Sequence, residues 1–277
     1  MKMVMEKENY DSFCIEAYQE EYDICFQKTR DEAGSQKFAM KQSLVRALKA
    51  YPDISPAEIW KSIHIAHMYR KTGMTDIDLI DMIVSADQSW KKSSGHAFEE
   101  MLKEYATAAL KGTDIEIVLQ RDLSKLLKNE ELSKEVRDYS WLKEQVKGNI
   151  FDLFAIVARG GKKYCFSCIQ AKTSVRDRVT RDREPSVHAM EAFFWSVIFL
   201  LDEDFMKMPK FFHMVNGGSP EFPGNGWHGM YVFSKKHYKD RIYSIDIDFQ
   251  QFRKHAVQAA DYWLTQRQWF NPAWRAE

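Results

Sequence analysis

The sequence predicts an α/β (α+β) protein in which a mixed central sheet is flanked by helices and preceded by a helical N-terminal region. Three observations predict this class. Residues 1–90 carry helical periodicity and helix-capping signals. Two apolar runs, IFDLFAIVA and KYCFSCIQA, are separated by the turn sequence RGGK. Further β-like and helical segments alternate after them. We therefore expect a helical region over 1–90 and a second domain over 91–277.

Composition excludes several broad classes of protein. The 277 residues are 45 % hydrophobic and 14 % aromatic, which is typical of a globular protein and excludes a disordered chain. Basic and acidic side chains both number 40, so a nucleic-acid site would have to be a local patch. The longest apolar run, at 192–201, is about half the roughly 20 residues that span a bilayer. Without an apolar leader segment either, we expect no membrane association and a cytoplasmic location.

The N-terminal region is expected to contain a series of helices. One is well marked, because Ser55 can cap it, Pro56 follows at its first position, and Gly73 stands just past its end. The expected helices cover about 5–31, 35–50, 55–73, 75–90 and 93–110.

The second domain is expected to begin with a strand at 114–120 and a helical stretch to about 147. The hairpin around RGGK follows, because glycines tolerate the positive φ of a tight turn. A helix at about 186–201, starting at Ser186, would bury the apolar run AFFWSVIFLL. The remaining segments are predicted to be strands at KFFHMVN, WHGMYVFS and RIYSIDI, and a closing helix at 249–269.

Cys165 and Cys168 form a CxxC motif on the second hairpin strand. A separation of three would place the two thiols on opposite faces of a regular strand. No second CxxC or HxxH pair follows at zinc-ribbon spacing. We therefore expect core cysteines and no zinc site.

The hairpin also carries candidate catalytic residues. Asp152 lies near the start of the first strand, and Gln170 and Lys172 share one face at the end of the second. The glycine turn would fold Asp152 back beside residues 169–171. This grouping suits Mg²⁺-assisted hydrolysis of a phosphodiester, with Asp152 holding the cation and Lys172 orienting or deprotonating the attacking water.

The register of the hairpin decides whether these side chains meet. A strict two-residue turn pairs Asp152 with Ile169, which places Asp152 and Lys172 on opposite faces. We therefore predict a three-residue loop, a β-bulge, or an Asp152 that lies just outside the regular ladder.

Asp152, followed by Gln170-x-Lys172 and preceded by a glutamate-bearing helix, resembles the PD-(D/E)xK nuclease fold. The stretch SGHAFEE resembles the first core helix of that fold, so the resemblance implies that Glu99, or in reserve Glu100, completes the metal shell. This sequence departs from the motif where Phe151 replaces proline. It also has Gln170 in place of a carboxylate, so the site lacks one negative charge.

In lacking this charge, the sequence is similar to a group of type II restriction endonucleases that recognise a CCGG core. In that group a glutamate from the helix after the lysine supplies the carboxylate. The candidates are Glu184 and Glu191. We favour Glu191, because on the expected helix it lies within an apolar face, where a charge is costly unless it has a ligand.

The same group reads C·G pairs with an R-x-D-R element four residues after its lysine. Arg176-Asp177-Arg178 begins four residues after Lys172 but lacks the spacer, and Arg181-Asp182-Arg183 follows as a second candidate. Arginine can donate a bidentate pair to guanine O6 and N7, and aspartate accepts from cytosine N4. The alternative is a solvated, salt-bridged loop.

The resemblance implies a Mg²⁺-dependent type II restriction endonuclease of the prokaryotic cytoplasm, without an organic cofactor. Its substrate would be double-stranded DNA with a palindrome containing CCGG, and its products would carry 5′-phosphates. A palindrome implies a homodimer or a higher homo-oligomer, in which the N-terminal region supports dimerisation or clamps DNA. The alternatives are a repair or recombination nuclease of the same fold and a non-catalytic DNA-binding regulator.

Overall fold

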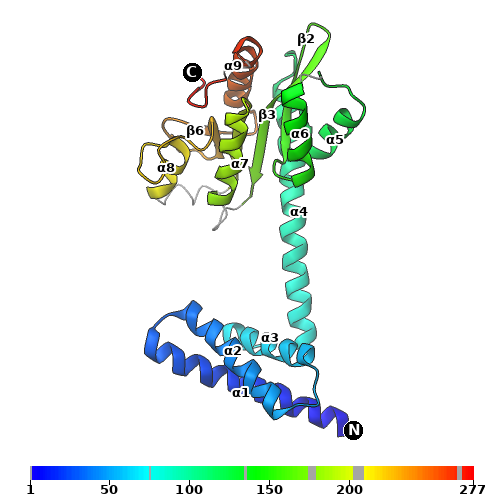
Figure 1. Cartoon of the computed structure of the whole chain (residues 1–277), viewed down its shortest axis with the longest axis vertical. Helices are drawn as coiled ribbons and strands as arrows, with labels where there is room; N and C mark the ends of the chain where they lie inside the picture. The colour runs from blue at the N-terminus through cyan, green and yellow to red at the C-terminus, as the bar shows by residue number, and fades with distance from the viewer. Residues whose placement is uncertain (1, 75, 134–135, 174–178, 202–208, 267–269) are drawn as a thin grey trace. The chain divides into compact units, whose positions relative to one another are not determined.

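This computed structural model describes residues 2–74, 76–133, 136–173, 179–201, 209–266 and 270–277. Residues Met1–Trp90 and Lys91–Glu277 form two compact units (Figure 1). Within the described ranges, no helix is both long enough and apolar enough to cross a membrane.

The first unit is entirely helical over its described residues. It contains α1 (Lys2–Thr29), α2 (Glu32–Ala50), α3 (Pro56–Thr72) and the beginning of α4 (Ile77–Ala109). The capping signals of α3 are confirmed, since Ser55 accepts a hydrogen bond from the Glu58 backbone and Gly73 adopts a φ of 75°. Small residues four apart line the buried face of α2, which lets its backbone approach its neighbours closely. They are Ser35, Ala39, Ser43 and Ala47.

Helix α4 replaces the two helices predicted at 75–90 and 93–110, so that prediction was wrong. Gly95 lies inside this helix. A glycine weakens a helix by about 1 kcal/mol relative to alanine, but it does not end one, and no proline follows it.

The second unit is built on a six-stranded sheet, counted over the described residues, whose strands lie in chain order. The strands are β1 (Ile115–Leu119), β2 (Leu153–Arg159), β3 (Lys162–Lys172), β4 (Trp195–Leu200), β5 (Gly229–Phe233) and β6 (Ile242–Ile245). β1, β2 and β3 pair antiparallel, and β3 to β6 pair parallel. The mixed sheet with flanking helices confirms the predicted α/β class.

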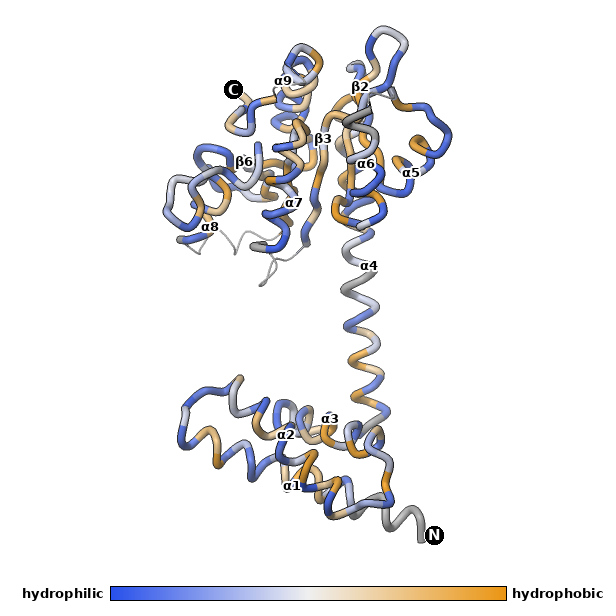
Figure 2. Tube along the Cα trace, viewed as in Figure 1, coloured by the Kyte–Doolittle hydropathy of each residue, from blue (hydrophilic) through white to orange (hydrophobic). Residues whose placement is uncertain are grey.

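Helices cover the faces of this sheet, as Figure 1 shows. Their bounds are α5 (Gln120–Lys128), α6 (Val136–Gly148), α7 (Val179–Glu191), α8 (Pro209–Asn216) and α9 (Gln250–Gln266). One core cluster joins the sheet to α4 and α9, and another joins it to α5, α6 and α7. Apolar residues, orange in Figure 2, follow β2 and β3 between these layers.

Two segments differ from their predicted structure. Trp195–Leu200 is strand β4 and not the end of a helix; all six of its residues are buried, as in parallel strands covered on both faces. KFFHMVN was predicted to be a strand and lies in helix α8, because Phe211, Met214 and Val215 recur at helical spacing and pack together.

The β2–β3 hairpin has the register irregularity that the sequence predicted. Gly160 and Gly161 form a two-residue turn with φ of 60° and 74°. The pairing then shifts by one residue, because Ala155 pairs with Ser167 while Ile156 pairs with Cys165. The intervening Phe166 is a β-bulge. It brings Leu153, and not Asp152, opposite Ile169.

The bulge also corrects the prediction for the CxxC motif. Cys165 and Cys168 lie in the same core cluster, on one face of β3, because the extra residue between them reverses the alternation. Both thiols are buried and free. Burial raises the pKa of the Cys168 thiol well above its usual value. The two residues therefore fill the core.

Candidate active site

Asp152 and Lys172 meet where β2 begins and β3 ends. The Asp152 backbone donates a hydrogen bond to the Ile169 carbonyl at 3.0 Å, and its carboxylate Oδ2 accepts one from the Ala171 N–H at 2.7 Å. These bonds fix the carboxylate against β3. The ammonium Nζ of Lys172 lies 3.7 Å from the same Oδ2. The one-residue shift at the bulge makes this approach possible.

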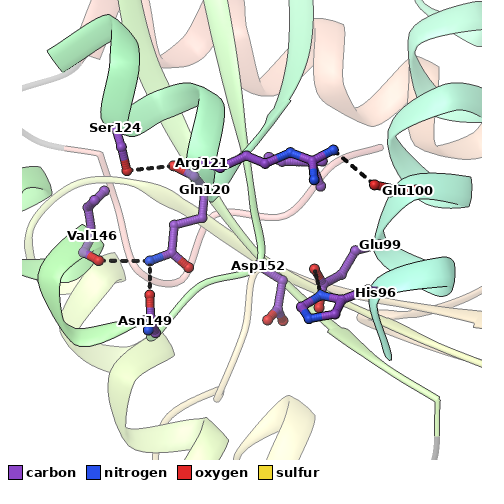
Figure 3. Close-up of a pocket in the computed structure, with 10 residues that line it drawn as sticks. His96, Glu99, Glu100, Gln120, Arg121, Ser124, Val146, Asn149 and Asp152 are labelled. Atoms are coloured by element: carbon purple, nitrogen blue, oxygen red, sulfur yellow. Dashed lines mark hydrogen bonds and ion pairs between the residues drawn. The ribbon is translucent and has the colours of Figure 1, made fainter. Parts of the chain in front are cut away.

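A pocket of about 690 Å³ opens beside Asp152. Figure 3 shows Glu99 and His96, both from α4, next to the Asp152 carboxylate. His96 Nδ1 lies 3.4 Å from Glu99 Oε2. The other lining residues come from α4, β1, α5, α6 and the residue that follows α6. They are Glu100, Leu119, Gln120, Arg121, Ser124, Val146 and Asn149.

Burial raises the pKa values of both carboxyl groups in this pocket. For Asp152, the Lys172 charge and the Ala171 N–H oppose the effect of burial without cancelling it. For Glu99, the negative charge of Asp152 adds to the effect of burial, while His96 and Lys172 oppose it. The two carboxylates therefore repel each other in a partly desolvated space, which favours a bound cation or a shared proton.

The oxygen donors of Asp152 and Glu99 fit a hard divalent cation such as Mg²⁺, which commonly takes one or two carboxylates and keeps several waters. In the part of the chain that the structure describes, no cluster of three or more His, Cys, Asp or Glu side chains is placed to hold a metal. A cation here would thus rely on two protein carboxylates.

Of the other candidate glutamates, Glu100 also lines this pocket, whereas Glu184 and Glu191 are not among its lining residues. The Glu100 carboxylate pairs with Arg121 at 2.9 Å. Glu184 is exposed on α7. Glu191 is exposed at the end of α7 and lines a second pocket of about 530 Å³ with Trp141 and His188. The reason for favouring Glu191 was wrong, because the apolar residues that follow it belong to strand β4 and not to its helix.

Gln170 does not face the pocket. It is 1 % exposed; its Nε2 donates to the Asp182 carbonyl at 2.9 Å, and its Oε1 accepts from Trp227 Nε1 at 2.8 Å. Both ends of the amide are therefore engaged by the protein.

Of the two Arg-Asp-Arg elements, only the second lies among the described residues. Arg176, Asp177 and Arg178 lie outside the described residues. In the second element, Asp182 Oδ1 lies 3.7 Å from Lys172 Nζ, while the Arg181 side chain is exposed.

Arg183, the last residue of the second element, is held by the protein. Its Nε donates to the Met214 carbonyl at 3.1 Å and its Nη2 to the Gly224 carbonyl at 2.7 Å. Its guanidinium also covers the Phe222 ring, 5.0 Å from the centroid. The partial burial lowers the pKa of Arg183. The geometry gives Arg183 a structural task in binding the loop that follows α8.

The sequence did not lead us to expect two neighbours of the site, His96 and Asp182. His96 stands three residues before Glu99, a spacing that places both on one side of a helix and could have signalled their contact. The approach of Asp182 to Lys172 had no local signal, since it depends on how α7 packs against β3.

Comparison with known proteins places this chain in a family. The model of the family described as BsaWI restriction endonuclease type 2 matches residues 131–269. A crystal structure of the pre-specific restriction endonuclease BsaWI–DNA complex superposes with a TM-score of 0.87 and 51 % sequence identity, covering 96 % of this chain and 98 % of that one. The chain belongs to the BsaWI restriction endonuclease family.

Membership in the BsaWI family confirms the predicted resemblance to type II restriction endonucleases. A crystal structure of the specific restriction endonuclease AgeI–DNA complex is also similar, at 18 % identity and a TM-score of 0.41, over 92 % of this chain and 90 % of that one. Among curated proteins, none matches the chain.

Proposed function

We propose that this member of the BsaWI family is a Mg²⁺-dependent type II restriction endonuclease that cuts double-stranded DNA at a palindrome with a CCGG core. The observation that carries the proposal is the placement of Lys172 Nζ 3.7 Å from Asp152 Oδ2, beside the pocket that Glu99 lines. The BsaWI structure is a DNA complex, which supports DNA as the substrate.

Asp152 and Glu99 would hold the Mg²⁺ ion through their carboxylate oxygens. When bound, the ion would supply charge neutralisation for the scissile phosphate and a lower pKa for a coordinated water. Lys172 would orient the attacking water and balance the charge that develops on the phosphate. In-line attack leaves a 5′-phosphate and a 3′-hydroxyl.

Recognition of the CCGG core is assigned to the Arg-Asp-Arg elements. The Arg183 guanidinium donates to two backbone carbonyls, and Asp182 faces Lys172. Because these contacts already hold Arg183 and Asp182, we assign contacts to bases to the first element, residues 176–178, together with the exposed Arg181. Each bidentate contact would contribute about 1–3 kcal/mol of discrimination between bases.

The partner of each chain is a second copy of itself on DNA. A palindrome presents the same sequence on both strands, so a two-fold homodimer brings one active site to each strand. The helical unit Met1–Trp90 would support this assembly or clamp the duplex.

The proposal is tested by incubating the purified protein with DNA that contains every hexanucleotide, with Mg²⁺ or with EDTA. We expect discrete fragments that require Mg²⁺, carry 5′-phosphates, and end within sites containing CCGG. Smeared or structure-dependent cutting would indicate a repair nuclease instead. Intact DNA that is nevertheless bound would indicate a non-catalytic regulator.

A further inference from the structure

We propose that Gln170 is a positioning residue: it fixes the start of α7 against β3, so that Asp182 and Asp152 hold the Lys172 ammonium between them. The inference rests on the proposed function, because it concerns the same cleavage site. It assigns a task to the position at which the nuclease motif would carry a carboxylate.

Lys172 lies between two carboxylates. Its Nζ is 3.7 Å from Asp152 Oδ2 and 3.7 Å from Asp182 Oδ1. All three side chains are largely buried, with exposed fractions of 27 % for Lys172, 21 % for Asp152 and 22 % for Asp182. An ammonium in such a place is oriented by both charges, and one of them depends on the position of α7.

Gln170 determines that position through its amide. It is 1 % exposed and lies two residues before Lys172 on the same face of β3. Its Nε2 donates to the main-chain carbonyl of Asp182, the residue whose side chain faces Lys172. The hydrogen bond therefore ties Asp182 to the strand that carries the lysine.

The chemistry of the neighbours explains why this residue is an amide. The indole N–H of Trp227 can only donate, and the Asp182 carbonyl can only accept. The side chain between them must offer one acceptor and one donor, as glutamine does. An ionised glutamate would offer acceptors alone and would face the Asp182 carbonyl in a buried space, where an unpaired charge is costly.

The experiment compares single-turnover DNA cleavage and DNA affinity for four forms of the full-length protein: unaltered, Gln170→Glu, Asp182→Asn and the double variant. Affinity is measured by gel shift with Ca²⁺ replacing Mg²⁺. Gln250→Glu is the matched control, because the Gln250 amide also donates to an aspartate carbonyl, that of Asp248, but on the exposed surface.

We expect Gln170→Glu to lower the cleavage rate by about 10²-fold, the typical effect of misplacing a catalytic group by about 1 Å. DNA affinity should change far less, and Gln250→Glu should cleave as the unaltered protein does. Because Gln170 acts through Asp182, the double variant should lose little more than the worse single variant.

Thermal melting identifies a variant that fails to fold. If Gln170→Glu does so, Trp227→Phe keeps an aromatic ring at this buried position and removes the N–H that holds the Gln170 amide, together with part of the indole. It should lower the cleavage rate in the same direction, by a smaller factor.

Two results would overturn the inference. One is cleavage by Gln170→Glu at the unaltered rate or faster, which would mean that the position serves as the carboxylate of the motif. The other is multiplication of the two single losses in the double variant. The proposed function itself fails separately, if the unaltered protein does not cut DNA at all.

Discussion

Two partly buried carboxyl groups with raised pKa values, those of Asp152 and Glu99, meet at one pocket. A raised pKa means that the folded state binds protons more tightly than the unfolded state. In metal-free solution their contribution to the free energy of unfolding is therefore lost as pH rises through the raised pKa values. A bound divalent cation would reverse that loss at neutral pH.

Glu99→Gln tests this electrostatic strain. In EDTA at pH 8 we expect the variant to melt about 2–4 °C above the unaltered protein, which corresponds to roughly 1 kcal/mol for a domain of this size. The difference should shrink at pH 4, where the carboxyl group is mostly protonated in both states. Added Mg²⁺ should stabilise the unaltered protein more than the variant. An equal response to Mg²⁺ would remove Glu99 from the metal shell.

Arg181 and Arg183 belong to the same Arg-Asp-Arg element and are expected to behave differently. Arg183→Ala leaves the Met214 and Gly224 carbonyls without their donor, so it should cost about 1–3 kcal/mol of stability. Arg181→Ala, on an exposed side chain, should stay within about 0.5 kcal/mol and weaken DNA binding. Urea denaturation and gel-shift titration measure the two effects. A stable Arg183→Ala protein with lost sequence preference would make Arg183 the base reader.

At the scale of elements, the hairpin was predictable and its bulge was predictable only in kind. The run RGGK located the turn, and the need for Asp152 to reach Lys172 required a shift in register. The sequence offered no means of placing the shift at Phe166, because the bulge depends on how that ring packs against Trp195. The apolar run around β4 was misassigned because a fully buried strand and a buried helix look alike in a short hydrophobic segment.

Two glycine substitutions test the backbone of these elements. Gly161 has a φ of 74° in the hairpin turn, so Gly161→Ala should destabilise the protein by about 1–2 kcal/mol. Gly95 lies inside α4 with open space around its Cβ position, so Gly95→Ala should stabilise by about 0.5–1 kcal/mol. Chemical denaturation of both variants gives the comparison. The assignment of α4 as one helix through Gly95 would be contradicted by a loss of stability in Gly95→Ala.

At the scale of the whole molecule, the candidate site joins residues from α4, the β2–β3 hairpin and α7. The pair Asp152 and Lys172 could be predicted because a hairpin brings its two ends together over a short length of chain. The approach of Asp182 to Lys172 and the exposure of Glu191 could not be predicted, because both depend on the rotation and length of α7. Sequence periodicity does not determine the bounds of a helix that is followed by a buried strand.

We propose that Lys172 beside Asp152 forms the cleavage site of a restriction endonuclease. The most direct test of this proposal is single-turnover cleavage of a CCGG-containing duplex by Lys172→Ala. Lys163→Ala serves as control, since Lys163 lies at the other end of the same strand and pairs with Glu131. We predict that Lys172→Ala binds the duplex in Ca²⁺ yet cuts it at least about 10³-fold more slowly, while Lys163→Ala cuts normally. Retained cleavage by Lys172→Ala would show that Lys172 does not belong to the cleavage site.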